Sequence, residues 1–397
     1  MDQPSNYAVS QRPVPLWRDE RVLRGAAQIV SALAVLGLLA WGLTNVLRAA
    51  DQRGLGLSFG FLEQSAGFPI SETPIAYDPS MSFARAFWVG ILNTLKVIIV
   101  GVLLATGLGT AVGLARLSTN WLLSRIALVY IEAHRNIPLL VLLFIWYRGV
   151  LTNRLPDVTN SLRWPGPTYL SQRGIYMPWP SLTETGMPFA ISIVLAIVLA
   201  IVAFRWLRRV RERTGRPTYF GGVAAAILIL LPALGWLLSG GQPLLWDIPI
   251  LSGFNFEGGA RVTPEFTALL IGLVMYTAAF IAEVVRAGIQ AVDRGQLEAA
   301  RAIGLDAAQV LGLVILPQAM RVIIPPLISQ YLNLTKNSSL AFFIGYPDLF
   351  SVGRIMINQA GRAVPVFAMI MAAYLVMTLV TSFVLNVYNR RIQLIER

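Results

Sequence analysis

The sequence has no cysteine, one histidine and almost no lysine. Without cysteine there are no disulfides and no thiol chemistry, and the lone His134 excludes histidine-rich metal sites. Lys96 and Lys336 are the only lysines, and neither precedes the Ser or Thr of the phosphate-binding pattern G-x-x-x-x-G-K-[ST]. The chain therefore cannot hydrolyse ATP through a P-loop, and no metal or nucleophile constellation suggests an integral membrane enzyme.

Charged residues are also scarce, at 13% of the chain, whereas 56% of its residues are hydrophobic. Soluble domains carry roughly 25% charged residues. Several apolar runs exceed the roughly 18 residues that indicate a membrane-spanning helix, and we find no alternating segments typical of barrel strands. The net charge of +12 comes mainly from arginines that flank the apolar runs, where they set topology, so nucleic-acid binding is not expected.

The hydrophobic pattern predicts an all-α polytopic membrane protein with about eight transmembrane helices. We expect the spans near residues 26–47, 87–115, 125–150, 188–204, 220–238, 264–286, 310–335 and 366–388. The densest arginine cluster, at 205–216, follows the fourth span. Because basic residues favour the cytoplasmic side, this cluster places both chain termini in the cytoplasm.

This topology divides the chain into a cytoplasmic tail, a first span with an outer segment, and a transmembrane domain, at residues 1–25, 26–86 and 87–397. Outer segments rich in glycine, proline and aromatic residues are expected at 48–86, 151–187 and 239–263. Loops of this length usually have a task. They form either a periplasmic rim for a partner or a set of interfacial aromatic anchors.

The most informative segment is a polar stretch at 287–309, between the sixth and seventh spans. Its residues 296–303 are good helix formers. A helix of about two turns is not stable alone, so it must dock on the protein's own spans or on a separate domain. Glu298 and Arg301 are i,i+3 neighbours and would form a surface pair.

The residues after this helix predict how it ends and how the chain continues. Gly304 stands where a left-handed cap would end the helix, and Asp306 with Gln309 fits a capping box that starts the next helix. The prolines of that next helix should kink it: Pro317, Pro325 and Pro326.

The polar stretch resembles the EAA loop of ABC importer permeases, with the pattern E-A-A-x3-G-x9-I-x-L-P. The isoleucine position holds Val314, a mild departure. The resemblance implies that the short helix inserts into a separate ATPase subunit and transmits its closing motion. The residues assigned to this coupling are Gly295, Gln296, Glu298, Ala299, Ala300, Arg301, Gly304, Leu316 and Pro317.

The resemblance extends along nearly the whole chain. Residues 93–118, 132–147 and 325–350 are similar to the polar amino acid (His/Glu/Gln/Arg/opine) permease subfamily, and 251–259 and 264–283 to its general L-amino acid branch. This implies a five-helix type I importer (MetI-like) core with extra spans and long outer loops. It also implies a bacterial inner-membrane permease that imports L-amino acids by alternating access.

The resemblance implies several partners as well. They are a homologous second permease in a heterodimer, two ATPase subunits, which hold ATP and Mg, and a periplasmic amino-acid-binding protein. The chain itself needs no cofactor and no metal. The alternative is an ion-coupled secondary transporter, which would require internal repeats and mid-membrane carboxylates; no convincing repeat is present, and Glu132 is the only strong candidate.

Ionisable and polar residues within the spans are candidates for the substrate path, because charges at membrane depth are costly. Pro138 should break the third span beside Glu132, Arg135 and Asn136. Glu132 and Arg135 would bind the two charges of an amino acid or satisfy each other. The polar run Lys336, Asn337, Ser338 and Ser339 would line the path or form a structural turn.

Four other polar residues have structural interpretations. We interpret Glu283 and Arg286 as anchors of the sixth span that orient the coupling loop. His134 is read as a packed or interfacial residue. Lys96 is read as extending its charge toward the membrane surface.

Overall fold

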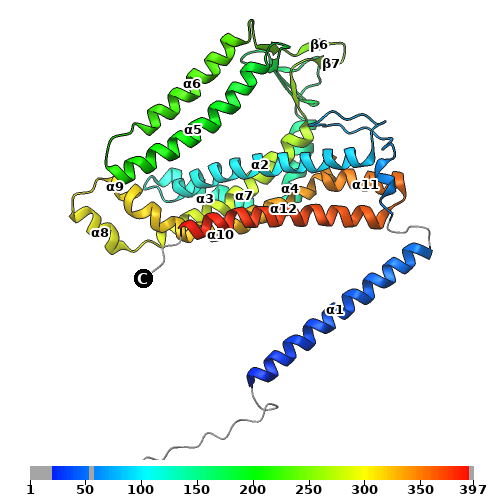
Figure 1. The fold of residues 1–397 in the computed structure, drawn as a ribbon, viewed down its shortest axis with the longest axis horizontal. Helices are drawn as coiled ribbons and strands as arrows, with labels where there is room; N and C mark the ends of the chain where they lie inside the picture. Colours follow the sequence, from blue (N-terminus) through cyan, green and yellow to red (C-terminus); the bar gives the residue numbers. More distant parts are fainter. Residues whose placement is uncertain (1–19, 53–57, 393–397) are drawn as a thin grey trace, which may run out of the picture. The chain divides into compact units, whose positions relative to one another are not determined.

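The computed structural model of the protein describes residues 20–52 and 58–392, so most of the predicted tail at 1–25 lies outside the described residues. The chain divides into two compact units, one formed by residues 1–90 and 352–376 and the other by 91–351 and 377–397. Most of the described residues are helical (Figure 1).

Twelve α-helices and four shorter 3-10 or π segments make up the helical part of the described chain. The α-helices are α1 Glu20–Gln52, α2 Phe83–Arg116, α3 Trp121–Asn136, α4 Leu139–Phe144, α5 Met187–Thr214, α6 Phe220–Leu238, α7 Pro264–Gln290, α8 Arg294–Ala302, α9 Ala307–Gln309, α10 Leu316–Asn337, α11 Leu349–Ala360 and α12 Ala363–Ile392. The 3-10 segments are η1 Gly60–Glu63 and η4 Ser338–Ile344, and the π segments are η2 Ile145–Thr152 and η3 Val310–Ile315.

Within the described residues, seven helices are long and apolar enough to span a membrane, or eight if α3 with α4 and η2 counts as one broken span. These eight correspond to the eight predicted spans. The third differs from a single helix, because the chain bends by 106° between α3 and α4. Pro138 is the cause, since its ring removes a backbone donor and disfavours helix at Ile137, which is extended at ψ 126.

Helix α7 is the central helix of the larger unit. It packs against α3, α4, η2, α10 and η4, and it buries Leu269 and Leu273 completely. Helix α2 approaches it closely through Gly109 and Gly113. A Cβ at Gly109 would lie 2.7 Å from the Cβ of Ile281, so this small-xxx-small step permits close helix packing.

Helices α5 and α6 form an antiparallel hairpin that packs mainly against itself (Figure 1). The rings of Phe204 and Phe220 meet edge to face near the turn, with centroids 5.0 Å apart. The Thr218 hydroxyl donates to the Leu207 carbonyl and closes the turn.

Eight short strands were not predicted: the outer segments at 151–187 and 239–263 were expected to be loops. The strands are β1 Leu162–Trp164, β2 Thr168–Ser171, β3 Gly174–Met177, β4 Trp179–Leu182, β5 Leu244–Asp247, β6 Ile250–Ser252, β7 Asn255–Glu257 and β8 Ala260–Val262. They form an antiparallel sheet in the order β1-β2-β3-β8 and two ribbons, β4-β5 and β6-β7. Because β3 pairs with β8 and β4 with β5, the two segments form one β insertion.

The smaller unit contains the outer segment after α1. Phe61, Phe68 and Phe83 are buried together, with ring centroids 5.7 and 6.3 Å apart. In the same unit, a Cβ at Gly353 of α11 would clash with the side chain of Ile370 of α12, so these two helices pack closely.

Candidate functional site

The polar stretch folds as a short helix between two membrane spans, as predicted. Asp293 caps the N-terminus of α8, and its carboxylate accepts a hydrogen bond from the Gly295 N–H at 2.6 Å. Only Ala300 of this helix is buried, and α8 packs against η3 of the same chain. The helix thus docks on its own protein through one side and leaves the other side exposed.

The C-terminus of α8 closes with two hydrogen bonds around a left-handed glycine. Gly304 has φ +84°, as the sequence predicts for a cap. Its N–H donates to the Arg301 carbonyl, and the Leu305 N–H donates to the Ala300 carbonyl, at 3.0 and 3.2 Å. This pair of bonds is the Schellman arrangement, which satisfies carbonyls at a helix end.

The next helix starts with the predicted capping box. The Gln309 N–H donates to the Asp306 carboxylate at 2.8 Å, and the Gln309 side-chain oxygen accepts from the Asp306 N–H at 2.9 Å. The π segment η3 then precedes Pro317, which lies in the first turn of α10. A proline at this place lacks the N–H for an i→i−4 bond, and a wider turn before it avoids the resulting clash.

The exposed side of α8 carries both charge and apolar surface. In the described part of the chain, Glu298 and Arg301 are exposed and form no ion pair with each other, so the predicted surface pair is wrong. Ile303, the residue after the last residue of α8, is 78% exposed. Ile303 was not predicted as a site residue, although an apolar residue directly before the cap glycine of a polar loop indicates an apolar contact surface.

Two polar side chains fix the end of α7 from which the polar stretch departs. Arg286 Nη2 lies 2.7 Å from Glu283 Oε2, and Arg286 Nη1 donates to Gln290 Oε1 at 2.6 Å. These bonds lie along one face of the helix, so they stiffen its last turns. The orienting role of Glu283 and Arg286 stays a prediction.

The break in the third span brings polar groups to the surface of α3. Asn136 Nδ2 donates to the carbonyl and the carboxylate of Glu132, at 2.8 and 3.2 Å. Arg135 instead lies over the ring of Phe280 on α7, 5.4 Å from its centroid. In the part of the chain that the structure describes, Glu132 and Arg135 are exposed and form no ion pair with each other. His134 packs against Tyr130, with ring centroids 4.3 Å apart and the rings tilted by 33°.

The hydroxyls of the polar run near the end of α10 are used within the chain. Thr335, Ser338 and Ser339 donate to the carbonyls of residues 331, 335 and 336, at 2.8 to 3.0 Å. Lys336 is exposed, whereas Ser338 is buried. Gly345 then ends η4 in the left-handed conformation at φ +82°.

A further polar group at the start of α7 was missed. Tyr147 of η2 donates to Glu265 Oε1 at 2.9 Å. Lys96 of α2 has its ammonium 4.1 Å from the ring centroid of Phe266. Lys96 is thus held over an aromatic ring. Its extension toward the membrane surface stays a prediction. The carboxylate next to Pro264, at the first turn of an apolar run, was the available signal.

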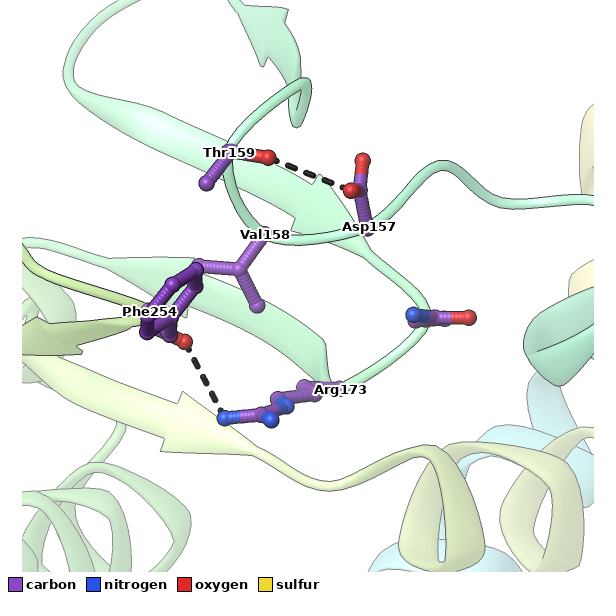
Figure 2. Close-up of a pocket in the computed structure, with 6 residues that line it drawn as sticks. Asp157, Val158, Thr159, Arg173 and Phe254 are labelled. Atoms are coloured by element: carbon purple, nitrogen blue, oxygen red, sulfur yellow. Dashed lines mark hydrogen bonds between the residues drawn. The ribbon is translucent and has the colours of Figure 1, made fainter.

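The β insertion contains a small polar cavity of about 110 Å³ (Figure 2). Figure 2 shows Asp157 and Thr159 on one side and Arg173, which donates to the Phe254 carbonyl at 3.0 Å, on the other. Hydrogen bonds from Asn160 and Thr159 hold the pKa of Asp157 below its usual value. The carboxylate therefore stays charged in mildly acidic solution.

The sequence of this chain is similar to those of several known proteins. The sequence profile described as "Binding-protein-dependent transport system inner membrane component" matches residues 192–394. The chain is 46% identical over 372 residues to a putative amino-acid ABC transporter permease, YhdX of Escherichia coli, covering 93% of this chain and 94% of that protein.

Two further relatives match with similar coverage. The general L-amino acid transport system permease AapQ of Rhizobium johnstonii is 43% identical over 371 residues, covering 93% of this chain and 92% of the relative. The glutamate/glutamine/aspartate/asparagine transport system permease BztB of Rhodobacter capsulatus is 41% identical, covering 96% of each chain.

Proposed function

This chain belongs to the family of amino-acid ABC transporter permeases, and from that premise we propose that it is the transmembrane subunit of an ATP-driven importer of L-amino acids. It spans the membrane several times and transports substrate by alternating access. Family membership disfavours the alternative of an ion-coupled secondary transporter.

The exposed side of α8 is the observation that carries this proposal. A nine-residue helix with caps at both ends presents unpaired Glu298, Arg301 and the apolar Ile303 to solvent. A partner with a complementary cleft would bury Ile303 and pair the two charges, and the capped ends would let the helix move as one body. The partners proposed for this surface are two ATPase subunits, which bind ATP and Mg.

The other partners are a homologous second permease and a periplasmic amino-acid-binding protein. The proposed location is the bacterial inner membrane, with both termini in the cytoplasm. This orientation puts the β insertion and its exposed Trp164, Trp179 and Trp246 in the periplasm, where a binding protein delivers substrate.

The proposed substrate path uses polar groups beside α7. Glu132, Asn136 and Arg135 lie at the break of the third span, and the exposed Lys336 offers a cation for a carboxylate. Because Thr335, Ser338 and Ser339 already donate within the chain, Lys336 and Asn337 are the better candidates in that run. Glu265 with Tyr147 adds an acidic group to the proposed path.

Co-purification and transport together test the proposal. The tagged chain should co-purify with an ATP-binding cassette ATPase in stoichiometric amounts, and liposomes that contain both permeases and the ATPase should import L-amino acids only with ATP and the binding protein. Uptake of amino acids by this chain alone, driven by an ion gradient, would overturn the proposal.

A further inference from the structure

The α5–α6 hairpin has membrane-facing surface that no other element of the described chain covers to any extent. Two grooves run between its helices, one near the turn and one near the opposite end, with volumes of about 520 and 540 Å³. Each is large enough for part of an acyl chain. The groove near the turn is lined by one charged residue, Arg205, and the other groove has none.

The groove near the turn is apolar along its length and basic at one end. On α5, Ile197, Ile201 and Arg205 follow each other at i, i+4 and i+8, so they form one ridge along the groove. On α6, Ala224 and Leu228 line the opposite side. The guanidinium therefore stands at the end of an apolar channel, the arrangement that a lipid with a charged headgroup requires.

The charge around Arg205 is strongly one-sided. Residues 205–216 include six arginines and a single acidic residue, Glu212. Glu212 is paired with Arg208 at 2.9 Å. Among the described residues Arg205 has no hydrogen-bonding or acidic partner. Its charge lies beside an apolar groove and is available to an anion.

We infer that this groove binds an anionic phospholipid, with an acyl chain along Ile197, Ile201 and Leu228 and the phosphate on Arg205. Arginine suits a phosphate because its planar fork donates two parallel hydrogen bonds. Arg209, one helical turn further along α5, lies within reach of the same headgroup. The exposed Trp206 and Tyr219 are residue types that favour the headgroup level of a membrane.

The position of the site suggests what the lipid does. In Figure 1 the hairpin turn lies at the same end of the view as α8 and α9. An anionic lipid there would hold the turn at the membrane surface on the side where the coupling helix emerges. The second groove is lined by apolar residues with one serine and has no charged residue, so it should accept acyl chains without headgroup preference.

Native mass spectrometry of the full-length chain tests the inference. The chain is titrated with phosphatidylglycerol and with phosphatidylcholine of the same chain length. The wild type should bind phosphatidylglycerol more tightly. Arg205→Gln should lower this affinity about fivefold, the effect of one arginine near an anionic surface, and leave phosphatidylcholine binding unchanged. The matched variant Arg213→Gln, roughly 12 Å further along α5, should retain the wild-type affinity.

A second pair of variants tests the apolar channel. Ala224→Phe fills the groove from α6 and should lower phosphatidylglycerol binding, whereas Ala233→Phe, at an exposed position outside both grooves, should not. Equal losses in Arg205→Gln and Arg213→Gln would show a diffuse basic surface and overturn the inference. A photo-crosslinker at Ile201 that captures a protein subunit instead of lipid would also overturn it.

Discussion

Gly304 sets the direction in which the chain leaves α8, because its φ of +84° is a conformation that side chains with a Cβ resist. A β-branched residue there costs about 1–2 kcal/mol, which corresponds to roughly a 5–30-fold loss of the capped geometry. We expect Gly304→Val to lower transport and ATPase stimulation by such a factor, with the amount of chain in the membrane unchanged. Both are measured in proteoliposomes that contain the partner subunits.

Two substitutions control for this result. Gly304→Asn should retain most activity, because asparagine tolerates the left-handed region. Gly107→Val, at a glycine with open space around it on α2, should also be tolerated. Wild-type coupling in Gly304→Val would show that the cap is not needed for the docked helix.

A role of Arg135 in transport can be distinguished from a structural role by comparison with Arg125 on the same helix. Arg135 lies over Phe280, and Arg125 lies over Trp121, with guanidinium-to-ring distances of 5.4 and 5.9 Å. Each contact contributes about 0.5–1 kcal/mol at an exposed site. If Arg135 lines the path, Arg135→Ala should reduce amino acid uptake several-fold more than Arg125→Ala. ATPase co-purification should survive in both. Loss of co-purification in Arg135→Ala would make the residue structural.

At the scale of helices, the contact of α2 with α7 depends on a missing side chain. A Cβ at Gly109 would lie 2.7 Å from the Ile281 Cβ and 2.9 Å from the Ala278 carbonyl oxygen. The carbonyl oxygen belongs to the backbone of α7, so it cannot move aside as a flexible side chain would. Overpacking of this kind costs about 1–3 kcal/mol. Gly109→Ala should therefore lower the thermal unfolding midpoint in detergent, measured by differential scanning fluorimetry. Gly107→Ala, two residues away in open space, should not, and equal midpoints would contradict the close packing.

The elements that the sequence predicted are those determined locally. Hydropathy over a run of about 18 residues locates a span, and the cap at Gly304 depends on neighbouring residues only. Strand β4 could not be found in this way, since its four residues pair with β5 from a different segment. Pro138 predicted a break in the third span but not the size of the bend, 106°, because α4 also packs against α7 from a distant part of the sequence.

In the candidate site too, local contacts were predictable and contacts between distant residues were not. The capping box of Asp306 and Gln309 was predictable because its partners are three residues apart. Tyr147 and Glu265 meet across 118 positions in the chain, which no local pattern reveals. The unpaired state of Glu298 and Arg301 was also unpredictable, because the i,i+3 spacing permits a pair that the side chains do not adopt.

At the scale of the whole molecule, the α5–α6 hairpin is an insertion into a ribbon of strands. Leu182 of β4 pairs with Leu244 of β5, and the Thr183 N–H donates to the Pro243 carbonyl at 3.1 Å. The segment that enters the hairpin and the segment that leaves it are therefore hydrogen-bonded to each other. Because the hairpin crosses the membrane twice, its removal leaves the orientation of the other spans unchanged.

We therefore expect residues 187–238 to be replaceable by a short turn. The shortened chain should insert in the membrane and co-purify with the ATPase, and it should lose the preference for phosphatidylglycerol. Membrane fractionation and quantitative co-purification against the full-length chain measure the first two outcomes. A shortened chain that is degraded, although the turn connects Thr183 to Pro243 without strain, would show that the core requires the hairpin.

The pairing of β3 with β8 also constrains how the protein is made. When β3 leaves the ribosome, its partner strand has not yet been synthesised, and two membrane spans lie between them. The two strands emerge in the same compartment if α5 and α6 both insert or both fail to insert. If one of the two helices fails to insert, β3 and β8 are left on opposite sides of the bilayer and their edges stay open to aggregation and proteases. The completed sheet therefore cannot form in a chain in which only one of these two helices has inserted.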